Sequence, residues 1–96
     1  MSGPDWKIMF RAIQEGDYEL VKYYLRMGID PNYQHPEYMA APLVESIRYK
    51  QLEIAKLLLA NNADPEIKEV DGGDTPMIVA KRLQLREAID LLNEAI

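Results

Sequence analysis

The strongest constraint on the fold is an internal repeat, because the 96-residue chain aligns with itself twice at an offset of 34 residues. Within each copy the apolar positions recur at i, i+1 and i+4, which is a helical spacing. A repeat of this length predicts stacked copies of one helical unit, since a single unit cannot bury its apolar face alone. The coinciding positions hold small residues at Ala12, Ser46 and Ala80, acids at Glu19, Glu53 and Glu87, and apolar pairs at Leu20-Val21, Ile54-Ala55 and Ala88-Ile89.

Each copy has the pattern of a short helix, a tight break, a second helix of about ten residues and an extended stretch containing proline. Gly28 and Asn62 coincide after the second helices, and both residue types tolerate the left-handed backbone of a helix C′ position. Thr75 precedes Pro76 and is expected to cap the helix that follows, whereas Ala41 in the equivalent position has no capping hydroxyl.

Two further expectations concern the segments around the helices. Asp5, just before Trp6, is expected to cap the first helix. The connectors at residues 29–41 and 63–75 are predicted to be hairpin-like, and the second contains the turn sequence Asp71-Gly72-Gly73-Asp74.

Taken together, these residues resemble the ankyrin repeat. The resemblance covers about residues 5–96 and implies an all-α, ankyrin-type solenoid of three helix-turn-helix repeats (5–36, 37–70 and 71–96) joined by hairpin-like loops. Residues 1–4 are expected to be an N-terminal leader or a cloning remnant. The middle copy matches the family pattern best, at Ala41-Pro42-Leu43, Leu52-Glu53-Ile54-Ala55, Leu57-Leu58-Leu59 and Asn62-Ala63-Asp64.

The sequence departs from the family pattern at several positions. Its period is 34 rather than 33, and the glycine between paired helices is kept at Gly16 but replaced by Lys50 and Gln84. If the backbone there is left-handed, each replacement costs about 1–2 kcal/mol. The histidine of the family start is absent and Phe10, Val44 and Ile78 stand in its place. The tetratricopeptide repeat also has a period of 34, but its short turns leave no room for connectors of this length.

Composition excludes several function classes. Eleven basic against sixteen acidic residues give a net charge of −5, which disfavours nucleic acid and anionic membranes as partners. The absence of cysteine excludes disulfide and thiolate chemistry and favours a cytoplasmic location. His35 is the only histidine, so no metal or other cofactor is expected, and Glu66 and Glu69 are expected to be solvated. We therefore expect no enzyme.

The resemblance also implies where a partner would bind. In the family the hairpin tips and the ends of the first helices line a concave side that meets the partner. Tyrosine and arginine dominate binding hot spots, and both occur there. We therefore expect a non-enzymatic module that binds a protein or peptide. The candidate contact residues are Tyr33, His35, Glu37, Tyr38, Arg48, Tyr49, Lys68, Glu69, Asp74 and Arg82.

The sequence also allows two other functions, and it bears on whether the chain is a complete domain or a piece of a longer repeat array. The negative charge fits an acidic immunity or inhibitor protein that neutralises a basic partner. A structural module that forms homodimers is the other alternative to a monomer. Polar residues in the end copies, such as Lys7, Arg11 and Lys81, favour a complete three-repeat domain over a piece of a longer array.

Overall fold

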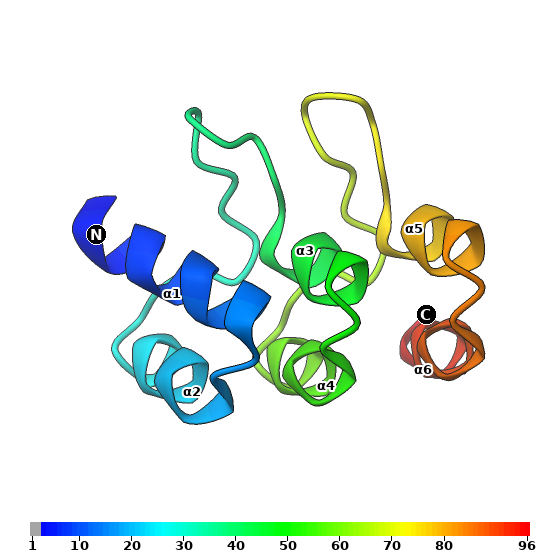
Figure 1. Cartoon of the computed structure of the whole chain (residues 1–96), viewed down its shortest axis with the longest axis horizontal. Helices are drawn as coiled ribbons and strands as arrows, with labels where there is room; N and C mark the ends of the chain where they lie inside the picture. The colour runs from blue at the N-terminus through cyan, green and yellow to red at the C-terminus, as the bar shows by residue number, and fades with distance from the viewer. Residues whose placement is uncertain (1–2) are drawn as a thin grey trace.

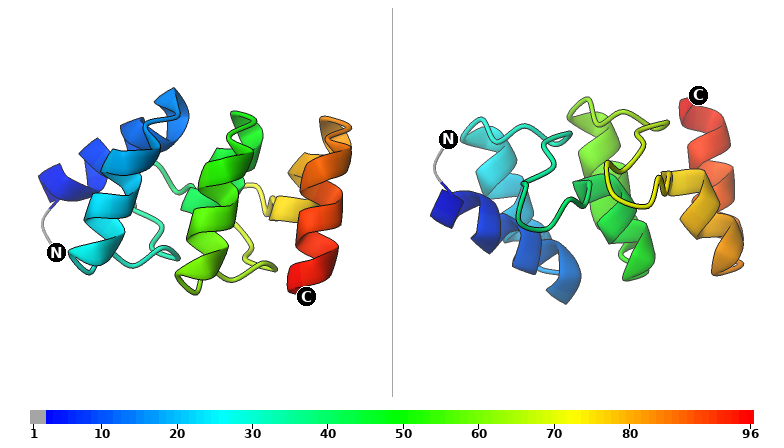
Figure 2. Two further views of the ribbon diagram at one scale, coloured as in Figure 1. Left: turned by 90° about the horizontal axis from the view of Figure 1, so that it is seen from below. Right: turned by 90° about the horizontal axis from the view of Figure 1, so that it is seen from above.

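The computed structural model describes residues 3–96, and within that range it contains six α-helices and no β-strand (Figure 1). The helices form three consecutive pairs, with α1, α3 and α5 in an inner layer and α2, α4 and α6 in an outer layer (Figures 1 and 2). The expected all-α solenoid of three helix pairs is confirmed. The helices are α1 (Gly3–Glu15), α2 (Tyr18–Arg26), α3 (Pro42–Arg48), α4 (Leu52–Ala60), α5 (Pro76–Arg82) and α6 (Arg86–Ala95).

One continuous apolar core joins the three pairs. The repeat-equivalent residues Ala12, Ser46 and Ala80 are all buried, which lets neighbouring helices approach closely. The hydroxyl of Ser46 donates to the Leu43 carbonyl at 2.7 Å, so its burial leaves no polar atom unpaired. Because each pair buries its apolar side against its neighbour, the stack stabilises every copy. The core includes Ile13, Val21, Ile47, Ile54, Leu58, Val79, Ala88 and Leu92.

The breaks between paired helices have the expected left-handed backbone, with φ of +78° at Gly16, +60° at Lys50 and +57° at Gln84. The same hydrogen bond closes each break: the amide of the next residue donates to a carbonyl five residues earlier, at 2.7–2.9 Å. Gly28 and Asn62 end the outer helices in the same way, with φ of +101° and +73°. Lys50 and Gln84 therefore hold a conformation that favours glycine.

The helix starts follow the predicted capping with one exception. The Oγ1 atom of Thr75 accepts a hydrogen bond from the Ile78 amide at 3.2 Å, and Ala41 makes no side-chain cap. The expectation that Asp5 caps the first helix was wrong, because α1 begins at Gly3 and Asp5 lies inside its first turn. Pro4 is compatible with that first turn, where an amide hydrogen has no partner within the helix. Residues 1 and 2 of the predicted leader lie outside the described residues.

Two long connectors, loop 1 (residues 27–41) and loop 2 (residues 61–75), rise from the same side of the inner layer (Figure 1). Seen from above, they lie next to each other along the stack (Figure 2). The loops and the inner helices thus form two walls that meet at an angle. We call the side on which these walls face each other the concave surface.

The strained breaks generate the first prediction. Replacing Lys50 with glycine should raise the free energy of unfolding by about 0.5–1 kcal/mol, because glycine adopts positive φ without the Cβ clash but loses more chain entropy on folding. Replacing Lys56, which lies inside α4, with glycine should lower it by about 1 kcal/mol. Urea denaturation of both variants measures the difference. A loss of stability in the Lys50 variant would contradict the strain argument.

Candidate functional site

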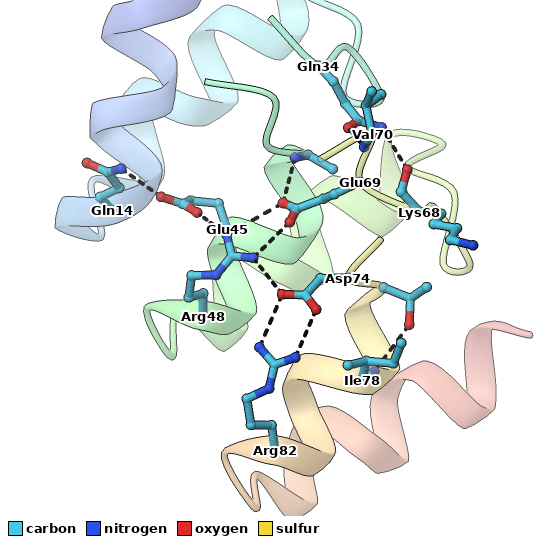
Figure 3. A network of polar contacts seen from close by, with 12 residues as sticks. Gln14, Gln34, Glu45, Arg48, Lys68, Glu69, Val70, Asp74, Ile78 and Arg82 are labelled. Carbon is cyan, nitrogen blue, oxygen red and sulfur yellow. Dashed lines mark hydrogen bonds and ion pairs between the residues drawn. The ribbon is translucent and has the colours of Figure 1, made fainter. Parts of the chain in front are cut away.

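A chain of ion pairs and hydrogen bonds crosses the concave surface from the first helix pair to the third (Figure 3). Gln14 of α1 donates to Glu45 of α3 at 2.7 Å, and Glu45 also accepts from Arg48 at 2.6 Å. From Arg48 the chain continues to loop 2, at 2.9 Å to Glu69 and 3.4 Å to Asp74. It ends on α5, where Arg82 binds both oxygens of Asp74 at 2.8 and 3.1 Å. We call these six residues the polar network.

Glu69 is the anchor of this network and is buried, with only 5% of its surface exposed. One of its oxygens accepts the backbone amide of Ala41 at 3.0 Å, and the other accepts from Arg48. The expectation that Glu69 is solvated was therefore wrong, whereas Glu66 is exposed. Burial of the Glu69 carboxylate is tolerated because a backbone amide and a guanidinium both donate to it.

Three residues of the network, Arg48, Asp74 and Arg82, have pKa values shifted in the direction that favours their charged forms. Burial alone would lower the pKa of Arg48, but hydrogen bonds to Glu69 and Glu45 raise that pKa above its ordinary value. The hydrogen bond from Arg82 lowers the pKa of the Asp74 carboxyl, and Asp74 in turn raises the pKa of Arg82. The guanidinium groups of Arg48 and Arg82 are thus matched by carboxylates of the same chain.

A second cluster gathers four of the predicted residues around Trp6. The Trp6 ring stacks on His35 and Tyr38, with centroids 4.5 and 5.2 Å apart, and Tyr33 meets it edge-on at 6.2 Å. Trp6 itself is 1% exposed, and its Nε1 atom has no hydrogen-bond acceptor among the described residues. Ring stacking, rather than a hydrogen bond from Nε1, therefore holds Trp6 in place.

Polar contacts complete this cluster at the tip of loop 1. The Nδ1 atom of His35 accepts the backbone amide of Glu37 at 3.0 Å, and the Glu37 carboxylate pairs with Lys7 of α1 at 3.2 Å. Tyr33 and Tyr38 remain 42% and 50% exposed. The cluster fixes these tyrosines on one face and leaves the other face open.

The two remaining candidates lie apart from both groups. Tyr49 follows Arg48 at the end of α3 and is 48% exposed. Lys68 is an exposed residue of loop 2, and its backbone carbonyl accepts from the Gln34 side chain at 3.1 Å. The ten predicted residues thus divide into an aromatic cluster at loop 1, the polar network, and two separate positions.

Two side-chain amides that join the loops were missed. Gln34 bridges to loop 2 by donating to the Lys68 carbonyl and accepting the Val70 amide at 2.8 Å. The Asn32 side chain also bridges to loop 2: it donates to the Asn62 carbonyl at 3.1 Å and accepts a hydrogen bond from the Asp64 amide at 2.7 Å. A signal existed for Asn32, because Asp30-Pro31-Asn32 fits the family's exit pattern, but no sequence signal pointed to Gln34.

The next question is whether the concave surface has the side chains of a metal site or of an acid-base catalyst. No three His, Cys, Asp or Glu side chains within residues 3–96 gather so that they could hold a metal ion. The hydrogen bond from Arg82 lowers the pKa of the Asp74 carboxyl, which favours its charged form over the protonated form that a general acid needs. No helix in the described part of the chain has the length and apolar character to cross a membrane.

Comparison with known proteins places this geometry in context. A family model for ankyrin repeats, in three copies, matches residues 9–95. Among curated proteins, the 2-5A-dependent ribonuclease of Homo sapiens is 33% identical over 76 residues and that of Mus musculus is 32% identical over 72 residues. The two alignments cover 79% and 75% of this chain but 10% of each ribonuclease. The chain therefore spans about a tenth of the length of these relatives.

The buried anchor generates a stability prediction. Replacing Glu69 with alanine should lower the free energy of unfolding by about 3 kcal/mol, because it leaves the Ala41 amide and the inner side of Arg48 without an acceptor. Replacing the exposed Glu66 of the same loop with alanine should change the free energy of unfolding by no more than about 0.5 kcal/mol. Denaturant unfolding of both variants provides the measurement, and equal losses would show that Glu69 is not an anchor.

The lowered pKa of Asp74 generates a pH prediction. Above the ordinary aspartate pKa of about 3.9, Asp74 is ionised in both states and its ion pairs stabilise the fold. As pH falls below that value the unfolded chain takes up the proton first, so the stabilisation is lost towards the folded-state pKa. The stability difference between wild type and Asp74→Asn should therefore be constant above about pH 5 and shrink below pH 4. A difference that does not change with pH would contradict the assignment.

Proposed function

Because this chain belongs to the ankyrin repeat family, we propose that it is a non-enzymatic module that binds a protein or peptide partner on its concave surface. Ankyrin repeats are protein-interaction modules, and the family match covers nearly the whole chain. We further propose that the module acts as a monomer in the cytoplasm. One observation carries the proposal: Tyr38 and Tyr49 are about half exposed on a surface whose frame is fixed by polar and aromatic contacts.

A fixed frame favours binding because little conformational entropy remains to be lost. The polar network links all three helix pairs, and Asn32 and Gln34 join the two loops. Tyrosine adds large contact area at a low entropic cost, since it has only two side-chain torsions to fix. A few such anchors suffice for an interface of about 800 Å² per partner.

The relatives contribute only part of this argument. Their names describe ribonucleases that depend on 2-5A, and each of those proteins is about ten times as long as the matched segment. We transfer neither RNA cleavage nor dependence on 2-5A to this chain. The proposal rests on the repeat family and on the exposed side chains of the concave surface.

The proposal predicts that binding depends on which face is altered. Partners obtained from a two-hybrid screen with the native host's proteins should lose at least about tenfold in affinity for the Tyr38→Ala, Tyr49→Ala double variant, because hot-spot residues each contribute more than about 1 kcal/mol. A matched double variant of exposed tyrosines on α2, Tyr18→Ala with Tyr23→Ala, should bind as wild type does. Isothermal titration calorimetry measures both. A loss of partner affinity seen only in the α2 variant would contradict the proposal and would place the binding surface on the outer layer.

A further inference from the structure

The two loops differ at their tips in a way that the repeat makes visible. At the offset of 34 residues, Tyr38-Met39 of loop 1 coincides with Gly72-Gly73 of loop 2. Both copies have a left-handed residue at the second position, with φ of +53° at Met39 and +69° at Gly73. Loop 2 thus has the residue that this backbone favours, while loop 1 has a large apolar side chain.

Met39 is unfavourable at this position on two grounds. A residue with a Cβ atom in the left-handed region is strained, and glycine at the equivalent position shows that the loop geometry does not need a side chain there. The Met39 side chain is also 41% exposed, so it gives up much of the gain that burial would bring. Strained residues cluster at functional sites, and here the strain coincides with an exposed apolar side chain, a combination that points to a contact made outside the chain.

The surface beside this tip is hollowed and is lined by both apolar and basic side chains. Lys7, Ile8 and Arg11 of α1 and Tyr38 of loop 1 line an open depression of about 500 Å³. Ile8 is 45% exposed. The Tyr38 ring is held in place by stacking on Phe10, with ring centroids 5.6 Å apart, and on Trp6. We call Lys7, Ile8, Arg11, Tyr38 and Met39 the loop 1 patch.

Charge distinguishes this patch from the rest of the concave surface. Arg48 and Arg82 are matched by Glu45, Glu69 and Asp74. By contrast, exposed Arg11 forms no ion pair with any carboxylate in the described part of the chain. Within residues 3–96, Lys7 pairs with Glu37 alone, and both side chains of that pair are half exposed, so the pair contributes little.

We propose that the loop 1 patch docks a partner segment that carries an apolar side chain next to a carboxylate. The apolar side chain fills the depression against Ile8 and Tyr38. Met39 follows Tyr38 in the chain and adds an exposed apolar side chain to the patch. The carboxylate accepts hydrogen bonds from Arg11 and from Lys7, one helical turn apart on α1. This inference rests on the proposed function, and it names the part of the concave surface and the chemistry that select the partner.

Selection from a random peptide library displayed on phage tests this inference. Peptides enriched on the wild-type chain should share an aspartate or glutamate beside a large apolar residue, and their affinity should fall as salt is raised. Lys7→Glu with Arg11→Glu should weaken the enriched peptides at least about tenfold. The matched control, Arg26→Glu with Arg86→Glu, makes the same change in net charge on the outer layer and should leave binding unchanged.

Met39→Gly separates a binding role from a structural one. It relieves the strained backbone, so the thermal unfolding midpoint should rise, while loss of the side chain should weaken the peptides about fivefold. Unchanged affinity in this variant would remove Met39 from the patch. Enriched peptides that lack an acid, or whose binding survives the Lys7 and Arg11 reversal, would overturn the inference and leave the proposed function standing. Failure to enrich any peptide would overturn it as well, whereas the proposed function is judged separately by the loss of partner affinity in the Tyr38 and Tyr49 variant.

Discussion

Stacking is the interaction on which the rest of this structure depends. Each helix pair has an apolar stripe too wide to cover by itself, so its neighbour must cover it. That requirement fixes small residues at Ala12, Ser46 and Ala80 and a single core that runs through all three pairs. Once the inner helices are set side by side, their ends and the loops between them are brought into a common row. The concave surface is therefore a consequence of burial elsewhere in the molecule.

The repeated features of the fold could be predicted from the sequence because they depend on local backbone chemistry. A helix that stops in a left-handed residue needs glycine or tolerates asparagine, and Gly28 and Asn62 show this directly. A threonine before a proline marks a helix start wherever it occurs, as Thr75 does. Lys50 and Gln84 were recognisable as strained only because Gly16 occupies the same place in the first copy. Each inference compares like positions and needs no knowledge of distant contacts.

The candidate site could be predicted only in outline, since its contacts join positions that are not equivalent in the repeat. At the offset of 34 residues, Glu69 coincides with His35 and Asp74 with Ala40. Alignment of the copies therefore gives no hint that Glu69 and Asp74 would both bind Arg48. Burial of Glu69 depends on the Ala41 amide, 28 residues away along the chain. Sequence reasoning named candidate residues for the concave surface but could not tell which of them bind one another and hold that surface together.

The same comparison explains why left-handed residues with side chains do not all carry the same meaning. Lys50 and Gln84 are strained, but their polar ends are hydrated, so exposure adds no further cost. Asn62 belongs to the residue type that tolerates this backbone best apart from glycine. Met39 differs from all three because strain and apolar exposure fall on one residue, next to a tyrosine whose ring is held in place by Trp6 and Phe10. Stacking requires the three copies to be alike at their core positions. The exposed positions at the loop tips do not take part in stacking, so they are where the copies can differ and where one end of the stack can bind a partner that the other does not.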